Sequence, residues 1–145
     1  MKAFIASDHA GLELKKGILR HLKAKGVKAE DLGPENAGQV DYPDFAKKVA
    51  KNVAAEKGSI GVLICGSGIG MSIAANKVKG IRAAKCNSVE EARLSRQHNN
   101  ANVLCLGARI LETNLALEIV DAFIETPFSG DERHKRRVEK MDKMC

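Results

Sequence analysis

Short apolar runs alternate along the chain with longer segments in which apolar residues recur about every four positions. The run Ile60–Cys65 is nearly continuous in Val, Ile and Leu, which is typical of a strand covered on both faces. Similar short runs bounded by polar residues and glycines indicate further strands. The predicted strands are residues 3–7, 27–33, 60–65, 80–86 and 101–107.

The segments between these runs have the spacing of amphipathic helices. Leu14, Ile18 and Leu22 mark one helical face between about residues 12 and 25. Further helices are predicted after Pro43, after the Ser-x-x-Glu capping box at Ser88, and at 111–125 and 131–145. Strands that alternate with helices predict an α/β fold, a three-layer Rossmann-like sandwich in which helices cover both faces of a five-stranded parallel sheet. Residues 1–145 are predicted to form a single domain.

The glycine-rich segment Gly66-Ser67-Gly68-Ile69-Gly70 directly follows the most apolar predicted strand. In a parallel sheet, ligands bind outside the carboxyl ends of the strands. The segment lacks the Gly-Lys-Ser/Thr of a phosphate-binding P-loop and is one residue short of the dinucleotide motif. We therefore expect a cradle of backbone N–H groups for an anion. The alternative is a tight turn that requires glycine.

Cys65 lies between this strand and the glycine loop. A nearby helix N-terminus favours the thiolate, which can act as a base or a nucleophile. The alternative is a small apolar residue at the end of a strand. Asp8 and His9 follow the first strand and are expected at the same sheet edge, although Asp8 could merely cap a helix and His9 could be an exposed loop residue.

Two further groups of polar residues occur in the second half of the chain. His98 and Asn99 end the predicted fourth helix, where a histidine can simply complement the helix dipole. Arg133 and Arg137 are four residues apart and share one face of the last helix. Paired guanidinium groups suit a phosphate, but a solvated charged face has the same pattern.

Composition narrows the function classes. The chain carries 24 Lys and Arg against 18 Asp and Glu, a net charge of +6, but the excess is spread out and aromatic residues make up only 3%. Nucleic-acid binding is therefore disfavoured, because few aromatic rings are available for base stacking. No apolar run reaches membrane-spanning length. The four cysteines and four histidines lack metal-site spacing, so we expect no metal and a cytoplasmic protein with reduced thiols.

Several segments resemble, in order and spacing, ribose-5-phosphate isomerase of type B. They are SDHAG, DYPDFA, ICGSGIGMSIAANK, GIRAA, ARLSRQHNNANVLCLGAR and RHKRRVEKM. The resemblance implies an aldose–ketose isomerase that interconverts ribose 5-phosphate and ribulose 5-phosphate by proton transfer through an enediolate, without a cofactor. The wider family also isomerises allose 6-phosphate and galactose 6-phosphate. A six-carbon sugar phosphate is therefore the alternative substrate.

The same resemblance implies roles for individual residues. Cys65 would be the base, His98 would open the sugar ring, and Ser67 would move a proton between the substrate oxygens O1 and O2. The backbone amides of the loop would hold the enediolate, and the other matched residues would contact the sugar or its phosphate. The matched substrate-binding residues are Asp8, His9, Tyr42, Gly66, Ser67, Gly68, Ile69, Gly70, Asn99, Arg109, Arg133 and Arg137.

The resemblance also implies a homodimer or homotetramer whose sites are completed across subunits, with helix 131–145 packed on a partner. The site requires the sulfur of Cys65, the imidazole of His98 and the loop amides to surround one pocket. A non-catalytic phosphate- or nucleotide-binding module on the same fold remains the competing hypothesis, because a fold does not determine a function. In such a module, Cys65 and His98 would have no chemical function.

Overall fold

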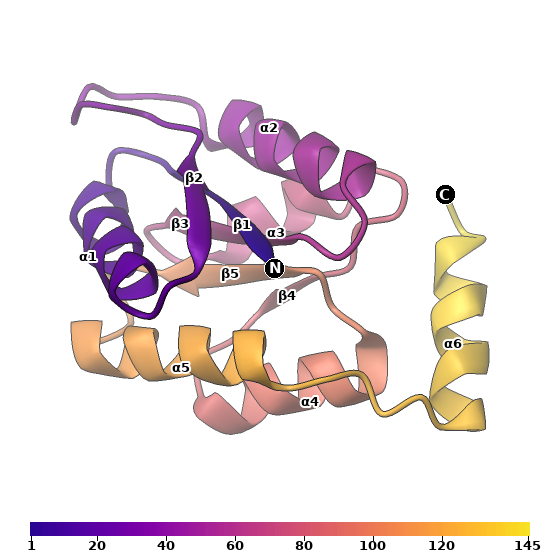
Figure 1. The fold of residues 1–145 in the computed structure, drawn as a ribbon. Coiled ribbons are helices and arrows are strands. Elements are labelled where there is room, and N and C mark those ends of the chain that lie inside the picture. Colours follow the sequence, from indigo (N-terminus) through magenta and orange to yellow (C-terminus); the bar gives the residue numbers. More distant parts are fainter.

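Five parallel strands form one sheet with the spatial order β2-β1-β3-β5-β4 in the computed structural model, which describes residues 1–145 (Figure 1). The strands are β1 (Lys2–Ser7), β2 (Lys28–Asp31), β3 (Ile60–Cys65), β4 (Ala83–Lys85) and β5 (Val103–Gly107). The predicted α/β class and parallel sheet are confirmed. The strand order reverses direction between β1 and β3, which is the position where such sheets bind ligands.

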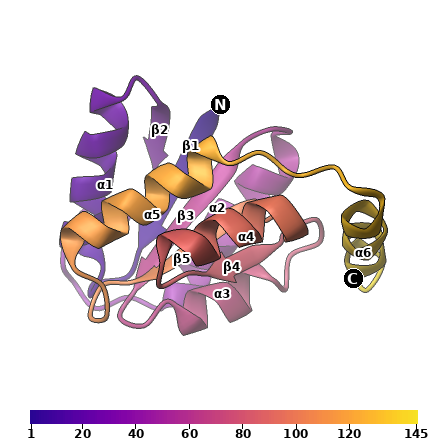
Figure 2. The same ribbon diagram turned by 90° about the horizontal axis from the view of Figure 1, so that it is seen from below.

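Helices cover both faces of the sheet, as the alternating pattern predicts (Figures 1 and 2). One face carries α1 (Leu12–Ala24), α4 (Val89–Asn99) and α5 (Thr113–Glu125). The other face carries α2 (Tyr42–Ala55) and α3 (Ile69–Ala75). The last helix, α6 (Glu132–Asp142), stands apart from both layers.

The central strands are apolar on both sides because each side meets a helical layer. In β3, Val62 and Ile64 pack toward α1 and α5, whereas Leu63 and Cys65 pack toward α2 and α3. All six residues of β3 are buried. Burial of one large aliphatic side chain contributes roughly 1.5–3 kcal/mol, so these layers supply most of the driving force for folding. The rigid sheet then fixes where its strand ends lie.

Several boundaries differ from the sequence-based expectations. The predicted strand 27–33 shortens to Lys28–Asp31, and the helix expected from residue 111 begins at Thr113. The capping box at α4 is present, since the Ser88 hydroxyl accepts a hydrogen bond from the Glu91 N–H at 3.1 Å. Its reciprocal contact is shifted by one residue, because the Glu91 carboxylate accepts from the N–H of Asn87.

Helix α6 makes few contacts with the rest of the chain. Its buried residues are His134 and Val138, and the helix ends at Asp142 rather than at the chain terminus. Arg133 and Arg137 are exposed. This arrangement is compatible with the prediction that α6 packs on a partner subunit.

Candidate active site

The carboxyl ends of three neighbouring strands form a cleft of about 620 Å³. Ser7 of β1 is aligned with Ile64 of β3, and Cys65 is aligned with Gly107 of β5. The loops that follow these residues are therefore adjacent. The cleft is lined by Asp8, Tyr42, Cys65, Gly66, Ser67, Ile69, Gly70, Ile73, Arg109 and Ile110.

Cys65 places its sulfur beside the glycine loop at this cleft. The side chain is 5% exposed, and the backbone N–H of Gly68 donates a hydrogen bond to Sγ at 3.1 Å. An N–H donor stabilises a thiolate more than a thiol, because the hydrogen bond to the charged sulfur is stronger. Burial raises the pKa of the Cys86 thiol to about 11, and burial also raises the pKa of Cys105. Among these buried cysteines, only Cys65 lines the cleft.

The loop backbone requires glycine at two positions. Gly68 has a φ of +79°, and a Cβ there would lie 2.9 Å from the backbone carbon of Leu106. A Cβ at Gly70 would lie 2.6 Å from the ring of Tyr42, the first residue of α2. These close approaches hold the loop between β5 and α2. The Ser67 hydroxyl accepts a hydrogen bond from the N–H of Ile69 at 3.2 Å and remains within the same loop.

Asp8 and His9 lie at the carboxyl end of β1, as predicted. The Asp8 carboxylate accepts a hydrogen bond from the N–H of Gly11 at 3.1 Å, so it does cap the turn before α1. It also lines the cleft, and capping and substrate contact are therefore compatible. His9 has a buried Nδ1 atom with no hydrogen-bond partner, and the buried hydroxyl of Ser7, two residues earlier, also lacks a partner. Buried polar atoms in proteins are normally hydrogen-bonded, so this part of the site holds unused hydrogen-bonding capacity.

His98 and Asn99 lie at the opposite end of the sheet from the cleft. This end, beside the first residues of the strands, is called the amino edge. The two residues end α4, and the carbonyl of nearby Asn102 accepts from the N–H of Gly61 beside the first residues of β3 and β5. Cys65 stands at the other end of β3, and a rise of about 3.3 Å per residue separates the two edges by roughly 13 Å or more. Within a single chain, the expectation that the Cys65 sulfur and the His98 imidazole surround one pocket is therefore wrong.

A second cluster surrounds His98 at this amino edge. The rings of His98 and His134 are 4.5 Å apart between centroids, and the Ser129 hydroxyl lies 2.7 Å from Nδ1 of His134. His134 is 4% exposed, and burial lowers its pKa, with nearby His98 and Arg133 acting in the same direction. A neutral His134 ring can pack against His98 without charge repulsion. Arg133 and Arg137 are on the same helix as His134 and add positive charge near this cluster.

The predicted site is thus divided into two groups. Cys65, Asp8, Tyr42, Arg109 and the loop residues other than Gly68 line the cleft at the carboxyl edge, and the predicted His9 follows β1 at the same edge without lining the cleft. The residues His98, Asn99, Arg133 and Arg137 belong to α4 and α6 at the other edge. Ile73 and Ile110 also line the cleft but carry no chemical signature in the sequence, because each is simply one more apolar residue beside a loop.

Neither a metal centre nor a membrane segment is evident. No group of three or more His, Cys, Asp or Glu side chains is arranged to hold a metal ion. None of the helices combines the length and apolar character that crossing a membrane requires.

The fold is that of an α/β protein, and its cleft lies at the carboxyl ends of the central strands, where parallel sheets bind ligands. The model of the Ribose/Galactose Isomerase family matches residues 3–141. The chain belongs to this family. Membership in a family of isomerases favours an enzyme over a non-catalytic binding module.

Individual relatives agree with this assignment. A probable ribose-5-phosphate isomerase B from Mycoplasma genitalium is 50% identical over 140 residues, which is 95% of this chain and 91% of the relative. The crystal structure of a ribose 5-phosphate isomerase from Thermotoga maritima is 50% identical, with a TM-score of 0.94 over 98% of this chain and 97% of that one. The M. genitalium isomerase structure with bound ribulose-5-phosphate is 48% identical, with a TM-score of 0.95 over 99% and 95% of the two chains.

Proposed function

We propose that this protein interconverts ribose 5-phosphate and ribulose 5-phosphate in the pentose phosphate pathway, with Cys65 as the base. The observation that carries the proposal is the hydrogen bond from Gly68 N–H to Cys65 Sγ at the cleft. The relative with bound ribulose-5-phosphate supports the choice of substrate. The thiols of all four cysteines are free, which fits the predicted cytoplasmic location.

The reaction moves one proton between neighbouring carbons of the open sugar. The Cys65 thiolate removes the proton from C2 and returns it at C1, and such a positioned base contributes roughly 10²–10⁴-fold to the rate. Charge develops on the enediolate oxygens in between. The N–H groups of Gly68 and Ile69 already donate to Cys65 and Ser67, so the other backbone N–H groups of the loop at residues 66–70 stabilise that charge, and one such donor is worth about 3 kcal/mol at the transition state. The Ser67 hydroxyl, which accepts from the Ile69 N–H in the same loop, would move a proton between O1 and O2.

The second half of the proposed site comes from another copy of the chain. His98 would open the ring, Asn99 would contact the enediolate, and Arg133 and Arg137 would bind the phosphate of a substrate held in the partner's cleft. Two observations support a covering subunit. Arg133 and Arg137 are exposed on a helix that stands off its own chain, and Ile69, Ile73 and Ile110 at the cleft are more than half exposed. Exposed apolar side chains grouped around a cleft are typical of a surface that a partner buries.

A two-fold dimer meets this requirement with one type of contact. In a two-fold interface, each subunit presents the same surface to the other, so two complete sites form at once. Each site would combine the carboxyl edge of one chain with α4 and α6 of its partner. A tetramer built from such dimers would keep the same sites.

Complementation between inactive variants tests both the chemistry and the sharing of the site. Cys65→Ala and His98→Asn should each lose most turnover. After equal amounts of the two variants exchange subunits, the mixture should regain about a quarter of wild-type activity, since half of the dimers are then mixed and one of the two sites in each mixed dimer is intact. If both groups act within one chain, no exchange can rebuild a site, and activity will stay at the level of the single variants.

The substrate assignment needs a separate comparison. The family description includes galactose as well as ribose, so a six-carbon sugar phosphate is the second candidate. Steady-state assays with ribose 5-phosphate, allose 6-phosphate and galactose 6-phosphate should give the highest kcat/KM for ribose 5-phosphate. A higher value for either six-carbon substrate would overturn the proposed specificity.

A further inference from the structure

We infer that Arg82 is a positioning residue that holds the end of α4 and the end of α6 in one arrangement. The inference rests on the proposed function, in which these two helices carry the groups offered to the partner's cleft. Arg82 directly precedes β4 and so lies at the amino edge, next to the second half of the proposed site, but the proposal assigns it no contact with the substrate. Its effect on the reaction must therefore pass through the residues that it holds.

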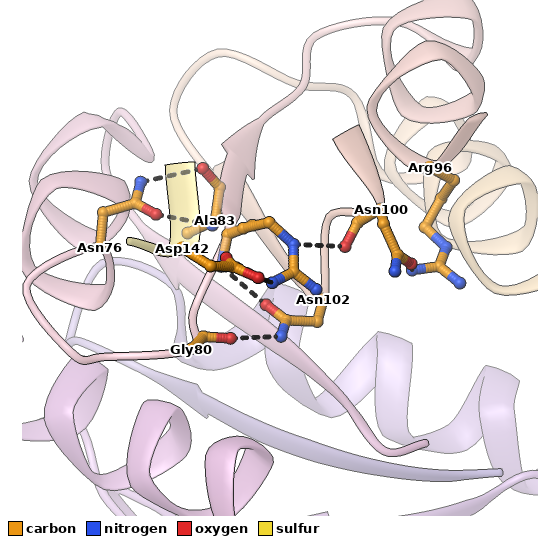
Figure 3. Close-up of polar contacts among 8 residues, drawn as sticks. Asn76, Gly80, Ala83, Arg96, Asn100, Asn102 and Asp142 are labelled. Atoms are coloured by element: carbon orange, nitrogen blue, oxygen red, sulfur yellow. Dashed lines mark hydrogen bonds and ion pairs between the residues drawn. The ribbon is translucent and has the colours of Figure 1, made fainter. Parts of the chain in front are cut away.

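The Arg82 guanidinium contacts residues at the ends of both helices, and Figure 3 labels these partners, Asn100 and Asp142. Its Nε donates a hydrogen bond to the carbonyl of Asn100 at 3.0 Å, directly after the last turn of α4. Its Nη1 lies 2.9 and 3.1 Å from the two carboxylate oxygens of Asp142 at the end of α6. The side chain is only 17% exposed, so these contacts are partly shielded from water.

The backbone of Arg82 is fixed independently of its side chain. The Asn102 side chain accepts from the Arg82 N–H at 2.8 Å and donates to the carbonyl of Gly80 at 2.9 Å. The Asn76 side chain bonds both the N–H and the carbonyl of Ala83, at 2.8 and 3.0 Å, where the edge strand β4 has no neighbouring strand. These hydrogen bonds fix the backbone from which the guanidinium extends, beside the outermost strand β4.

Within its own chain, helix α6 depends on Arg82 because few other contacts hold the C-terminal end of the helix. Its first turns are attached through His134, which contacts Ser129 and His98, and through Val138. Beyond Val138, a cleft of about 420 Å³ that includes Met141 and Asp142 in its lining separates the helix from β4. The ion pair with Asp142 is thus the polar anchor that sets the direction of α6 and with it the position of Arg137.

The end of α4 depends on Arg82 for a different reason. Asn100 is the only non-glycine residue with a positive φ, at +46°, and this conformation costs roughly 1–2 kcal/mol in an ordinary residue. The turn is held by Arg82 on its carbonyl and by Arg96, whose Nη1 lies 3.4 Å from the Asn100 side-chain oxygen. Because Asn99 and His98 immediately precede this turn, its geometry decides where their side chains point.

Two substitutions separate the two contacts of Arg82. Asp142→Asn removes the charge that anchors α6 and leaves the Asn100 contact intact. It should raise KM for ribose 5-phosphate and the inhibition constant of inorganic phosphate by about fivefold, with kcat within a factor of about two, which is the size expected for loss of a partly exposed ion pair. Arg82→Lys keeps a cation for Asp142 but loses the Nε donor to Asn100. It should lower kcat by about fivefold and change KM less.

The matched control is Glu30→Gln, which breaks the ion pair between Lys2 and Glu30 at the opposite edge of the sheet. The Glu30 side chain is 48% exposed and that of Asp142 is 41% exposed, so the two carboxylates are comparable. The control should change neither kcat nor KM. Hydrogen exchange across residues 132–142 should accelerate in Asp142→Asn and stay unchanged in the control.

The outcomes distinguish this inference from the proposed function. A wild-type protein without isomerase activity overturns the proposed function, whatever the exchange data show. An active wild type together with unchanged KM and phosphate inhibition in Asp142→Asn overturns the inference. If both variants show the same fall in kcat and the same rise in KM, the inference is also overturned, since the two contacts of Arg82 would then not be separable.

Discussion

The Gly68→Ala substitution adds one atom, a Cβ, that should disturb both the packing of the loop and the hydrogen bond to Cys65. The new Cβ would lie 2.9 Å from the carbonyl carbon of Leu106 and 3.2 Å from the nitrogen of Gly107, both backbone atoms of the central sheet. The positive φ costs a non-glycine residue roughly 1–2 kcal/mol. Overlap with atoms that cannot move away adds about 1–3 kcal/mol. The free energy of unfolding should therefore fall by about 2–5 kcal/mol, a large part of the roughly 5–15 kcal/mol of a typical domain.

The same substitution should weaken the chemistry of Cys65. Relief of the overlap moves the residue 68 N–H away from Sγ, to which it donates at 3.1 Å. A hydrogen bond to a charged group is worth roughly 1.5–3 kcal/mol, so alkylation of the Cys65 sulfur should slow about tenfold or more. Iodoacetamide labelling at neutral pH, followed on the Cys65 peptide by mass spectrometry, should slow by this factor. Labelling of exposed Cys145 provides an internal reference.

Gly26→Ala is the matched control for backbone strain. Gly26 has a φ of +74°, close to that of Gly68, but a Cβ there would meet nothing within 4 Å. Urea unfolding of both variants at one fixed protein concentration isolates the overlap at residue 68 from the strain common to both. The reasoning is refuted if Gly68→Ala is no less stable than Gly26→Ala and Cys65 is labelled at the wild-type rate.

Two further predictions concern buried ionisable groups. Because burial lowers the pKa of His134, its contribution to stability is fully present above the ordinary histidine value of 6.5 and declines as the pH falls below it. The His134→Gln variant should therefore lose less stability than the wild type between pH 8 and pH 5.5. Urea unfolding at both pH values measures these losses, and an identical loss in the two proteins would contradict the prediction. Lys15 is 1% exposed and donates to Asp31 at 2.8 Å and to the Pro34 carbonyl at 2.6 Å. Asp31→Ala, which leaves the buried ammonium unpaired, should cost about 1–3 kcal/mol. Lys15→Met should cost less than about 1 kcal/mol, because it removes the buried charge itself, and thermal unfolding that ranks the two variants in the reverse order would refute this account.

The elements of this fold were predictable where burial decides them. A strand such as β3 is apolar along its whole length because helices cover both of its faces, and its predicted range is the observed one. The β2 strand was predicted too long, since it lies at the edge of the sheet, where polar residues extend the pattern without pairing. At α5, Leu111 and Glu112 fit the helical spacing but belong to the turn after β5, where the N–H of Leu111 bonds to the carbonyl of Gly107. Periodicity does not distinguish such a turn from a first helical turn.

The candidate site was predictable to a different degree at its two edges. Cys65 and the glycine loop follow a strand, so the topology rule for parallel sheets places them at the cleft without further information. Arg82 and Lys15 were missed because their roles depend on contacts with residues distant in the sequence, Asp142 and Asp31. No local pattern marks a single basic residue as an anchor. Such residues emerge only when the packing of the elements is known.

The division of the site follows from the topology itself. In a parallel sheet with helical crossovers, every segment that follows a strand lies at the carboxyl edge, and every segment that precedes a strand lies at the amino edge. Cys65 follows β3, whereas His98 precedes β5, so the length of the sheet separates them in one chain. Under the proposed mechanism, the sulfur of Cys65 and the imidazole of His98 must nevertheless contact the same small sugar. A second copy turned end to end brings the amino edge of one chain to the carboxyl edge of the other, and a two-fold axis does this for both chains at once. If these residues share one reaction, the topology therefore requires an assembly of at least two subunits.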